Sequence, residues 1–504
     1  MDLIESIEDH ICKILSDIVG MKILFLDNIT KTIVSMTCSK RKLLQTETFL
    51  FNLISQRHVN QTTDKLTDIS AVYFLCPSAA NIAILTTELS DPNYNRYWLY
   101  FNGIIEDDQI EKLAMHDKFE VVSRVEECYY NYYAITSNVF ITTDCKTDSI
   151  LSLIYNIRQS VESKTNIAIR YCGKSEHALA SKLDLMINID RTLITSDDIS
   201  VLIIDRSFDP IAPLLIPLTY QAMIFEYLVG INDNKNQLGH FGLPLNRLID
   251  QFYCDHANTN YHELCDIINK KVLQSKSRIK PNVSVNDLRE ITCQISEHCK
   301  TKNILSYHVN LLTEVTTIMA SNNTADIYYL QRSILSKSLT DVDVASLKTI
   351  LNNNKINKIY RLSLLMLYTL TYGTDDNLID IVDGSKSIVE SYLKYCGKQS
   401  NNKPGIITSM LAPLQNLLST YNPEITAIAE KLATNTLDQK KYPYINHSSK
   451  SRSTIIIING GVTYAEATHI AEFNQSNLNH RVILGGDMMH NCSSFIDYIL
   501  KKNE

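Results

Sequence analysis

Two carboxylates and a guanidinium follow directly after the apolar run Val201–Ile204: Asp205, Arg206 and Asp209. In parallel α/β sheets, catalytic groups often lie beyond the carboxyl ends of the strands, where two carboxylates can act as general acid and base. No nucleophile or metal ligand accompanies them. Because Asp-Pro sequences favour turns, we interpret Asp205, Arg206, Asp209 and Pro210 as a structural corner fastened by hydrogen bonds, and we expect no catalytic residue here.

Two glycine pairs offer a second kind of chemistry. Gly460-Gly461 and Gly485-Gly486 each follow an apolar run and precede a helical pattern, where backbone N–H groups can hold a phosphate. Neither pair has the remaining residues of a P-loop or of a dinucleotide-binding motif. A phosphate-binding α/β enzyme that uses these turns is therefore the alternative function, and tight strand-to-helix turns are the simpler explanation. We expect no cofactor.

A third group could bind zinc: Cys254, His256, His262 and Cys265 are all possible ligands. Their spacing matches no common structural zinc site. The acidic residues between them are typical of a solvated helix and loop. We therefore expect no metal.

The elements that would position these residues alternate in the first part of the chain. An amphipathic helix at 4–18 is followed by strand and helix patterns, which imply a mostly parallel sheet that ends near Tyr133. The predicted strands are 21–27, 32–36, 70–76, 96–103 and 119–125. The predicted helices between them are 40–54, 79–89 and 106–117.

A second α/β pattern covers 146–205 and gives way to long helical stretches after Ile231. These helices are expected at 303–319, 326–339, 359–373 and 384–397, with loops at 351–358 and 398–405. The run Ile455–Ile458 is typical of a strand buried on both faces. Because two late strands cannot bury themselves alone, we expect them to complete the sheet beside the strand that ends at Asp205.

Composition limits the class of protein. A chain of 504 residues predicts about three domains, and a net charge of −7 argues against a nucleic-acid partner. The 12 cysteines include no CxxC pair and no secretory signal is expected, which favours a reducing, cytoplasmic location. Proline and polar residues interrupt the uncharged stretches 69–87 and 404–423, so neither is predicted to span a membrane.

Four stretches carry a resemblance to a known family. Residues 202–231, "LIIDRSFDPIAPLLIPLTYQAMIFEYLVGI", closely resemble the central motif of the SM (Sec/Munc) family. Residues 360–372, 442–445 and the C-terminal pair "GGVTYAEA" and "VILGGDMMHNCSSFI" match further motifs in the family's order. The spelling of that pair is most similar to one branch, which works between the trans-Golgi network and endosomes.

The resemblance implies an arch of three domains: α/β domain 1 at 1–133, discontinuous α/β domain 2 at 134–231 and 445–504, and helical domain 3 at 232–444. It implies no enzyme activity. It implies a regulator of vesicle fusion that binds a syntaxin-type SNARE and promotes assembly of the SNARE bundle in endosomal or vacuolar transport. Such a protein is cytoplasmic, monomeric outside the SNARE complex and recruited peripherally to Golgi and endosomal membranes.

In this family the N-terminal peptide of the syntaxin docks beside the last helix and strand of domain 1. The matching positions here are Ile110, Leu113, Ala114, Val121 and Val125. Ile110 and Leu113 share one helix face, so one can line the core while the other meets the peptide. The alternative is that both are core residues, because an apolar helix stripe usually packs inward.

Two further surfaces follow from the resemblance. Leu305, Val309 and Leu312, continued by Val315 and Met319, form a stripe on a helix expected to align SNARE helices. We expect Leu305 and Leu312 to be partly accessible; the alternative is that the stripe packs inside domain 3. The preceding segment, 231–302, is shorter than in the family. This leaves open whether the family's helical hairpin is present here.

The basic cluster Lys40-Arg41-Lys42 is assigned to the edge of the central cleft. The alternative for this cluster is a solvated helix start.

Overall fold

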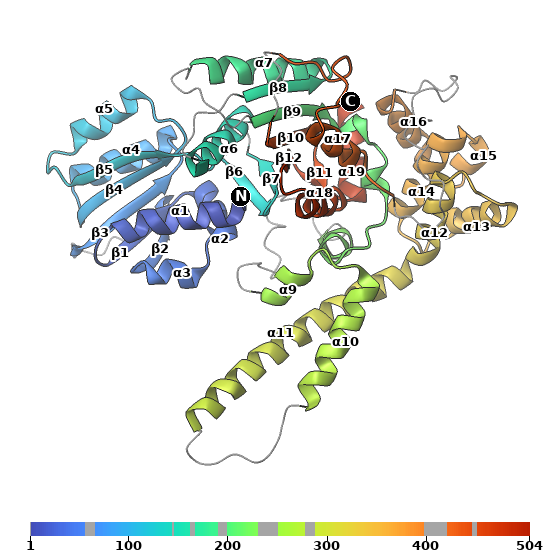
Figure 1. Ribbon diagram of the computed structural model, residues 1–504, viewed down its shortest axis with the longest axis horizontal. Helices are drawn as coiled ribbons and strands as arrows, with labels where there is room; N and C mark the ends of the chain where they lie inside the picture. Colours follow the sequence, from blue (N-terminus) through green and yellow to red (C-terminus); the bar gives the residue numbers. More distant parts are fainter. Residues whose placement is uncertain are drawn as a thin grey trace. The chain divides into compact units, whose positions relative to one another are not determined.

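The computed structural model describes residues 2–55, 66–143, 146–161, 167–189, 199–229, 250–277, 288–397, 421–445 and 451–503. They form two compact units (Figure 1). Unit 1 consists of Met1–Asp205, Leu432–Asn459 and Asn474–Met488. Unit 2 consists of Arg206–Lys431, Gly460–Phe473 and Met489–Glu504.

Unit 1 begins with a parallel five-stranded sheet in the order β2-β1-β3-β4-β5. Its strands are β1 (Lys22–Leu26), β2 (Thr48–Leu53), β3 (Leu66–Leu75), β4 (Tyr94–Asn102) and β5 (Val122–Cys128). Its helices are α1 (Leu3–Asp17), α2 (Asn28–Thr37), α3 (Lys40–Gln45), α4 (Ala79–Ser90) and α5 (Asp107–His116). All five residues of β1 are buried, as expected for a central strand in a sheet covered on both faces.

Two predicted elements of this sheet are wrong. Residues 32–36, predicted as a strand from their β-branched side chains, belong to α2, because Asp27 and Thr30 form a capping box that begins a helix. Residues 40–54, predicted as one helix, divide into α3 and β2. Glu47 lies between them with φ 61°, a left-handed conformation that ends the helical path.

Unit 1 also holds a six-stranded sheet in the order β6-β7-β12-β10-β9-β8. The strands are β6 (Tyr132–Thr136), β7 (Val139–Thr142), β8 (Ile167–Cys172), β9 (Ile199–Asp205), β10 (Ser453–Asn459) and β12 (Arg481–Gly486). Helices α6 (Lys146–Val161) and α7 (Lys174–Ile189) accompany them. The strands β10 and β9 pair in parallel from Ser453–Ile199 to Asn459–Asp205, which confirms the predicted pairing. The antiparallel hairpin β6–β7 was not predicted.

The outer edge of β8 is covered by the Tyr-Pro-Tyr-Ile stretch at 442–445. Tyr444 forms an antiparallel bridge with Arg170, whose guanidinium lies 4.5 Å from the Tyr444 ring centre. Arg170 is 2% exposed and donates hydrogen bonds to the carbonyls of Tyr442 and Leu437, at 2.9 and 3.0 Å. A strand edge that would otherwise offer free backbone groups is thereby occupied.

Unit 2 is mainly helical. Its helices are α8 (Tyr220–Ile224), a π-helical turn η4 (Phe225–Val229), α9 (Gln251–His256), α10 (Tyr261–Ser277), α11 (Leu288–Ser321), α12 (Thr324–Leu335), α13 (Asp341–Asn352), α14 (Lys358–Tyr372), α15 (Asp376–Ile379), α16 (Ser385–Tyr395), α17 (Glu424–Ala433), α18 (Tyr464–Ser476) and α19 (Cys492–Asn503). Helices α10 and α11 run side by side as a hairpin (Figure 1), so the hairpin is present although its segment is short.

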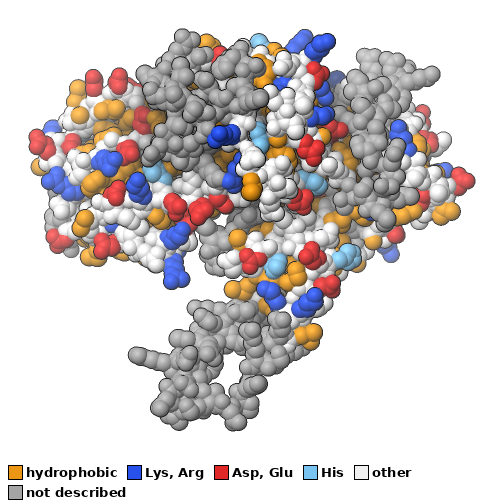
Figure 2. Space-filling model, in the orientation of Figure 1, with side chains coloured by type: hydrophobic (Ala, Val, Ile, Leu, Met, Phe, Trp, Pro, Cys, Tyr) orange, Lys and Arg blue, Asp and Glu red, His pale blue; other side chains and the backbone are white. Residues whose placement is uncertain are grey.

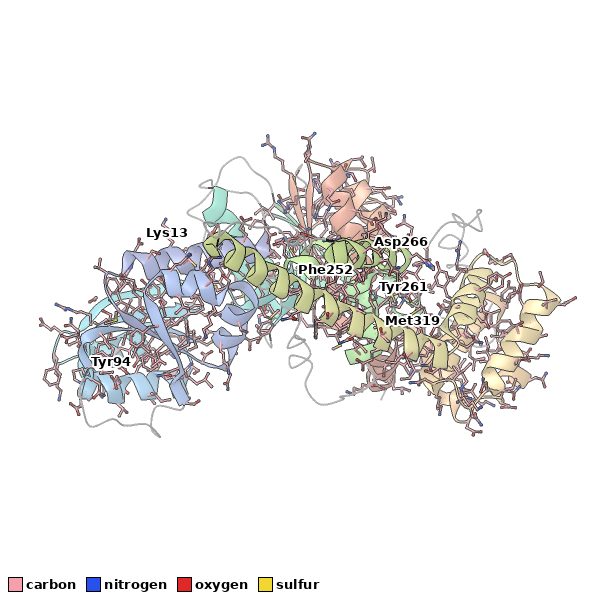
Figure 3. The ribbon with its side chains drawn as sticks, turned by 90° about the horizontal axis from the view of Figure 1, so that it is seen from below. Lys13, Tyr94, Phe252, Tyr261, Asp266 and Met319 are labelled. Carbon is pink, nitrogen blue, oxygen red and sulfur yellow. The ribbon has the colours of Figure 1, made fainter. Side chains whose placement is uncertain are left out.

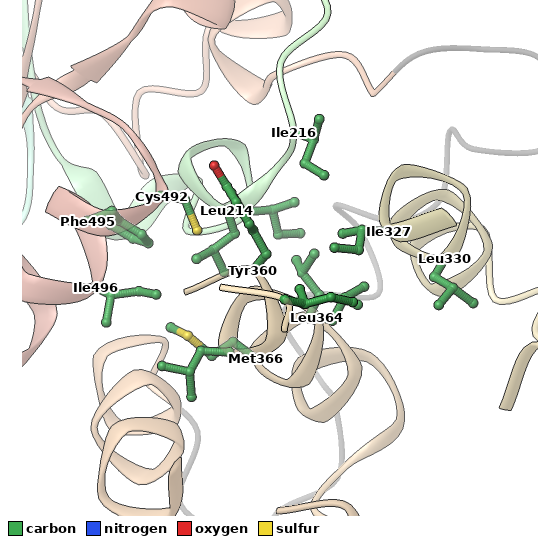
Figure 4. Packing of buried hydrophobic residues seen from close by; sticks show 14 of the residues in the cluster. Leu214, Ile216, Ile327, Leu330, Tyr360, Leu364, Met366, Cys492, Phe495 and Ile496 are labelled. Carbon is green, nitrogen blue, oxygen red and sulfur yellow. The ribbon is translucent and has the colours of Figure 1, made fainter. Parts of the chain in front are cut away.

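The core of unit 2 surrounds α14, a helix that is buried on nearly every side. Tyr360, Leu364 and Met366 of α14 pack with Phe495 and Ile496 of α19 (Figure 4). In the parts of the chain that the structure describes, no helix is long and apolar enough to cross a bilayer. Of the two uncharged stretches, 69–87 is divided between β3 and α4. Most of 404–423, like the expected loop 398–405, lies outside the described residues.

Candidate functional site

The predicted peptide-binding positions on α5 and β5 divide into exposed and buried residues. Ile110 and Val125 are 39% and 43% exposed, Ala114 is exposed, and Val121 is partly buried. Leu113 is 4% exposed and lies in the core of the five-stranded sheet. The assignment of Leu113 to a surface pocket is therefore corrected: at the three-residue spacing, Leu113 faces the core and Ile110 faces outward.

Three more apolar residues are exposed in this region. Ile104, Met115 and Phe119 are 63%, 71% and 61% exposed. Together with Ile110 and Val125 they define what we call the α5–β5 surface. Sequence reasoning missed the three because they lie beside or at the ends of α5, where no helical period marks them. The loop and strand before and after a predicted binding helix would have been the place to look.

The α5–β5 surface also carries charged side chains and a strand edge. Asp107 and Asp108 occupy the first turn of α5, where the helix dipole favours carboxylates. Lys112 forms a 2.8 Å ion pair with Asp108 that is exposed to water and adds little stability. Strand β5 is the last strand of the sheet as described, so its outer edge has backbone groups that an extended segment could pair with. The α5–β5 surface thus combines exposed apolar side chains, excess negative charge and a strand edge.

The predicted stripe on α11 is mostly internal. Leu305 and Leu312 are each 7% exposed, and Val315 is fully buried. Val309 and Met319 are partly buried against the same core, and Figure 3 shows Met319 on α11 beside Tyr261 of α10. The expectation that Leu305 and Leu312 are accessible is wrong, because these two residues hold the base of the hairpin in the core of unit 2.

A buried histidine supports that base. His308, on α11, has no exposed surface, and its Nδ1 lies 2.7 Å from the hydroxyl of Tyr220. Burial lowers the pKa of His308, although the nearby Asp250 carboxylate, 2.9 Å from Nε2, opposes the shift. The polar contacts therefore fix the packing of α11, and Val309 and Met319 are the partly buried members of the predicted stripe.

The basic cluster lies on α3 in unit 1. Lys40 and Arg41 are exposed, whereas Lys42 donates a 2.8 Å hydrogen bond to Glu8 of α1. That bond raises the pKa of Lys42. Glu8 also accepts from the backbone N–H of Ser39, so Lys42 serves to join α3 to α1. Two of the three basic side chains remain for a partner.

The corner residues form a buried network in unit 2. Arg206 is fully buried and pairs with Glu466 of α18 at 2.8 Å. It also donates to the carbonyl of Asp209 at 2.6 Å. Burial alone would lower the pKa of Arg206, but the Glu466 carboxylate outweighs it and raises that pKa. Arg206 therefore stays charged and joins two chain segments that are distant in sequence.

Asp209 fastens the other side of this network. Its Oδ1 accepts hydrogen bonds from the N–H groups of Ile211 and Ala212, at 3.1 and 3.0 Å, and from the hydroxyl of Tyr421 at 2.9 Å. The carbonyl of Pro210 accepts a bond from Tyr392. Asp209 is only 1% exposed, so these contacts hold its carboxylate inside the corner. Asp205, at the end of β9, is partly exposed.

The first glycine pair lies in a crowded turn. Gly460 and Gly461 adopt φ 104° and 98°, which favour glycine, and a Cβ on Gly460 would lie 2.4 Å from the Tyr498 hydroxyl. The carbonyl of Gly460 accepts from His490, and that of Gly461 accepts from Arg206. Carbonyls that face buried donors cannot attract an anion.

The second glycine pair belongs to strand β12. Gly485 is covered by the ring of Phe140, and a Cβ at this position would lie 2.3 Å from that ring. The phosphate-binding hypothesis therefore finds no support at either pair.

The four possible zinc ligands lie on α9 and the start of α10. Cys254 and His262 are exposed, and His256 packs against the ring of Phe252 at 4.7 Å. Within the described part of the chain, no group of three or more histidine, cysteine or acidic side chains is placed to hold a metal ion.

Known proteins share the sequence pattern and the fold of this chain. A model of the Sec1 family matches residues 22–498, nearly the whole chain. The chain belongs to the Sec1 family. The match includes both sheets, the buried corner and the α10–α11 hairpin, so the family's sequence pattern runs through both units.

Among its Sec1 relatives, the chain is 27% identical to vacuolar protein sorting-associated protein 45 of Dictyostelium discoideum over 552 residues, covering 99% of this chain and 96% of the relative. It is 24% identical to the protein of that name from Saccharomyces cerevisiae, covering 95% of this chain and 94% of the relative.

Solved structures of Sec1 proteins share the fold. One is the SM protein Vps45 in complex with the Qa SNARE Tlg2, with a TM-score of 0.82 at 24% identity over 99% of this chain and 98% of that one. Another is the Unc18–syntaxin 1 complex from Monosiga brevicollis, with a TM-score of 0.78 at 17% identity over 99% of both chains.

Proposed function

We propose that this protein is an SM-type regulator of vesicle fusion, which binds a syntaxin-type SNARE and promotes SNARE assembly in trans-Golgi and endosomal transport. The observation that carries the proposal is the Sec1-family match over residues 22–498. Its support is that the similar proteins include Vps45 in complex with the Qa SNARE Tlg2. The protein is recruited to Golgi and endosomal membranes from the cytoplasm, and none of its described helices is long and apolar enough to cross a bilayer.

The α5–β5 surface is the proposed site for the N-terminal peptide of the SNARE. Ile110 and Val125 are its apolar contacts, with Ala114 and Val121 beside them; Leu113 supports the site from the core. The exposed residues Ile104, Met115 and Phe119 enlarge it. Since soluble proteins seldom gather exposed apolar side chains without a partner, this clustering supports a binding role.

A second site is proposed on the α10–α11 hairpin, where amphipathic SNARE helices would align against a helical partner. Val309 is the partly exposed residue of the original set, and Leu305 and Leu312 hold its backbone in place. Lys40 and Arg41 are the proposed basic contacts at the cleft edge. The division into domains at 1–133, 134–231 with 445–504, and 232–444 is part of the same proposal, as is their arrangement in an arch.

No catalytic step is proposed. The carboxylate of Asp209 is occupied by protein donors, and the carbonyls of Gly460 and Gly461 point to buried cations. These contacts favour a structural role for the residues that most resemble an active site.

The test is calorimetric titration of the protein with synthetic N-terminal peptides of syntaxin-type SNAREs. We expect Ile110→Arg to weaken binding at least tenfold, because a charge would replace an apolar contact. The matched control is Leu185→Arg on α7. Leu185 is another exposed apolar residue of unit 1, with 67% of its surface exposed, so this variant should bind the peptide normally.

If Ile110→Arg and the unmodified protein bind the peptide equally, the peptide does not bind at this surface. Failure of every syntaxin-type peptide to bind would count against the proposed function itself. The thermal transitions of both variants should match that of the unmodified protein, since both positions are exposed.

A further inference from the structure

A cavity of about 350 Å³ opens in unit 2, beside the start of α10, and none of its lining residues lies on α11 or on the α5–β5 surface. Its size lies within the range of sites that hold small ligands or a few side chains. Four parts of the chain that are far apart in sequence meet around it, with Tyr421 and Pro423 completing the wall. The lining residues come from 212–219, 258–263, 328–335, 421–423 and 465–472.

One wall of the cavity is apolar and is held in shape before any ligand arrives. Ile216, Leu335 and Ala465 belong to this wall. Gln331 of α12, 1% exposed, accepts a hydrogen bond from the N–H of Ile216 at 3.0 Å and donates to the carbonyl of Leu214 at 2.9 Å. Because Gln331 fixes the loop, the wall does not have to be ordered on binding.

A second wall carries free backbone donors. Leu218–Tyr220 runs antiparallel to Thr259–Tyr261, and two backbone hydrogen bonds of 3.0 Å join them. The N–H groups of Thr219 and Asn260, which both line the cavity, have no acceptor among the residues that the structure describes. Because Thr219 and Asn260 face each other between these two bonds, their N–H groups point to opposite sides, and an extended segment can pair with one of them, as with a sheet edge.

The rim is charged unevenly. Glu263 of α10 is exposed and has no ion-pair partner within the described chain, and Glu472 of α18 is a second acidic residue of the lining. Arg332 of α12, also in the lining, lies 5.7 Å from the ring centre of Tyr328. The carboxylates of Glu263 and Glu472 therefore favour a basic group on the ligand.

We propose that this cavity binds a short extended segment of a partner protein in which an apolar residue stands next to a lysine or arginine. The apolar side chain packs on Ile216 and Leu335, and the basic side chain pairs with Glu263. A backbone carbonyl of the segment accepts a hydrogen bond from the N–H of Thr219 or of Asn260. A single segment of this kind meets the size of the cavity, its apolar wall, a free backbone donor and the charge of its rim.

The probe is a phage-displayed library of random heptapeptides selected on the full-length protein. We expect the selected sequences to share an apolar residue beside a lysine or arginine. Measured by calorimetry with the corresponding synthetic peptides, Glu263→Lys should weaken binding at least tenfold. Asp266→Lys, three residues further along the exposed face of α10 (Figure 3) and outside the lining, is the matched control and should bind normally.

Ala465→Trp, which fills the cavity, should also abolish binding. Selected peptides that bind Glu263→Lys and the unmodified protein equally would overturn the proposal, as would a library that yields no shared sequence. Because Glu263 is exposed, its substitution leaves the fold intact even if Ala465→Trp does not. Neither result depends on the SNARE-peptide titration, since the two experiments use different surfaces.

Discussion

The network around Arg206 buries charged groups, whereas the α5–β5 surface exposes apolar ones. In unit 2, a full ion pair is withdrawn from water together with the carboxylate of Asp209. In unit 1, Ile104, Met115 and Phe119 are left in water. Burying charged groups and exposing apolar side chains both cost free energy. The first is compensated by hydrogen bonds within the chain, whereas the second finds no such compensation among the described residues, which is why we propose a partner there.

The comparison predicts that breaking the buried network costs stability and leaves binding unaffected. Arg206→Ala would strand the Glu466 carboxylate without a counter-charge, and we expect a loss of about 3–5 kcal/mol in the free energy of unfolding. Urea denaturation measures it. The control is the double variant Arg206→Met with Glu466→Leu, which removes both charges and should recover much of the loss. A loss below about 1 kcal/mol for Arg206→Ala would mean that the ion pair is not holding the corner.

A smaller effect separates two neighbours on α5. Leu113→Ala removes core contacts and should lower the free energy of unfolding by about 2–4 kcal/mol, because it leaves a cavity. Ile110→Ala, on the exposed face of the same helix, should change it by less than about 0.5 kcal/mol. Thermal denaturation of the two variants decides the matter. If both were equally destabilised, Ile110 would be a core residue and the α5–β5 surface would lose its central contact.

Glu226 gives the smallest effect, and one that depends on pH. This carboxylate on the turn η4 accepts a 3.1 Å hydrogen bond from the N–H of Cys492, at the start of α19. Burial raises its pKa to about 7. The folded protein therefore holds a proton that the unfolded chain releases near its ordinary pKa, so stability falls as pH rises from about 4.5 to about 7.

The measurement is the free energy of unfolding at several pH values. Glu226→Gln should remove this part of the pH dependence and stabilise the protein at pH 8 by up to about 3 kcal/mol, since no buried charge has to form. Glu472→Gln on α18 is the exposed control and should leave the profile unchanged. A variant Glu226→Gln with the original profile would show that another group titrates.

The fold was predictable wherever burial left one solution. Ile455–Ile458 needs cover on both faces, and the strand ending at Asp205 was the natural neighbour to supply it. Helix α2 was mistaken for a strand because the β-branched residues Thr32, Ile33 and Val34 outweighed the capping box in the prediction. Local propensity is weaker than a cap that satisfies two backbone donors.

The candidate sites were less predictable, because a helical period shows that a face packs but not against what. Leu113 and Ile110 have the same spacing as many core pairs, and the structure alone separates them. On α11 the same reasoning gave the wrong accessible residues, Leu305 and Leu312. The cavity lining is drawn from segments between Ala212 and Glu472, and no motif joins segments so far apart in a sequence.

The pairing of β9 with β10 has a consequence for the folding of the chain during its synthesis. β9 ends at Asp205 and β10 begins at Ser453, so at 5–20 residues per second roughly 250 residues and some 10–50 s of translation pass between them. During that time an isoleucine-rich strand has one unpaired edge, which other nascent chains can join. Strands β10 and β12 are the last strands of this sheet to be made. We expect newly made protein to depend on a chaperone that shields this edge until β10 and β12 have left the ribosome.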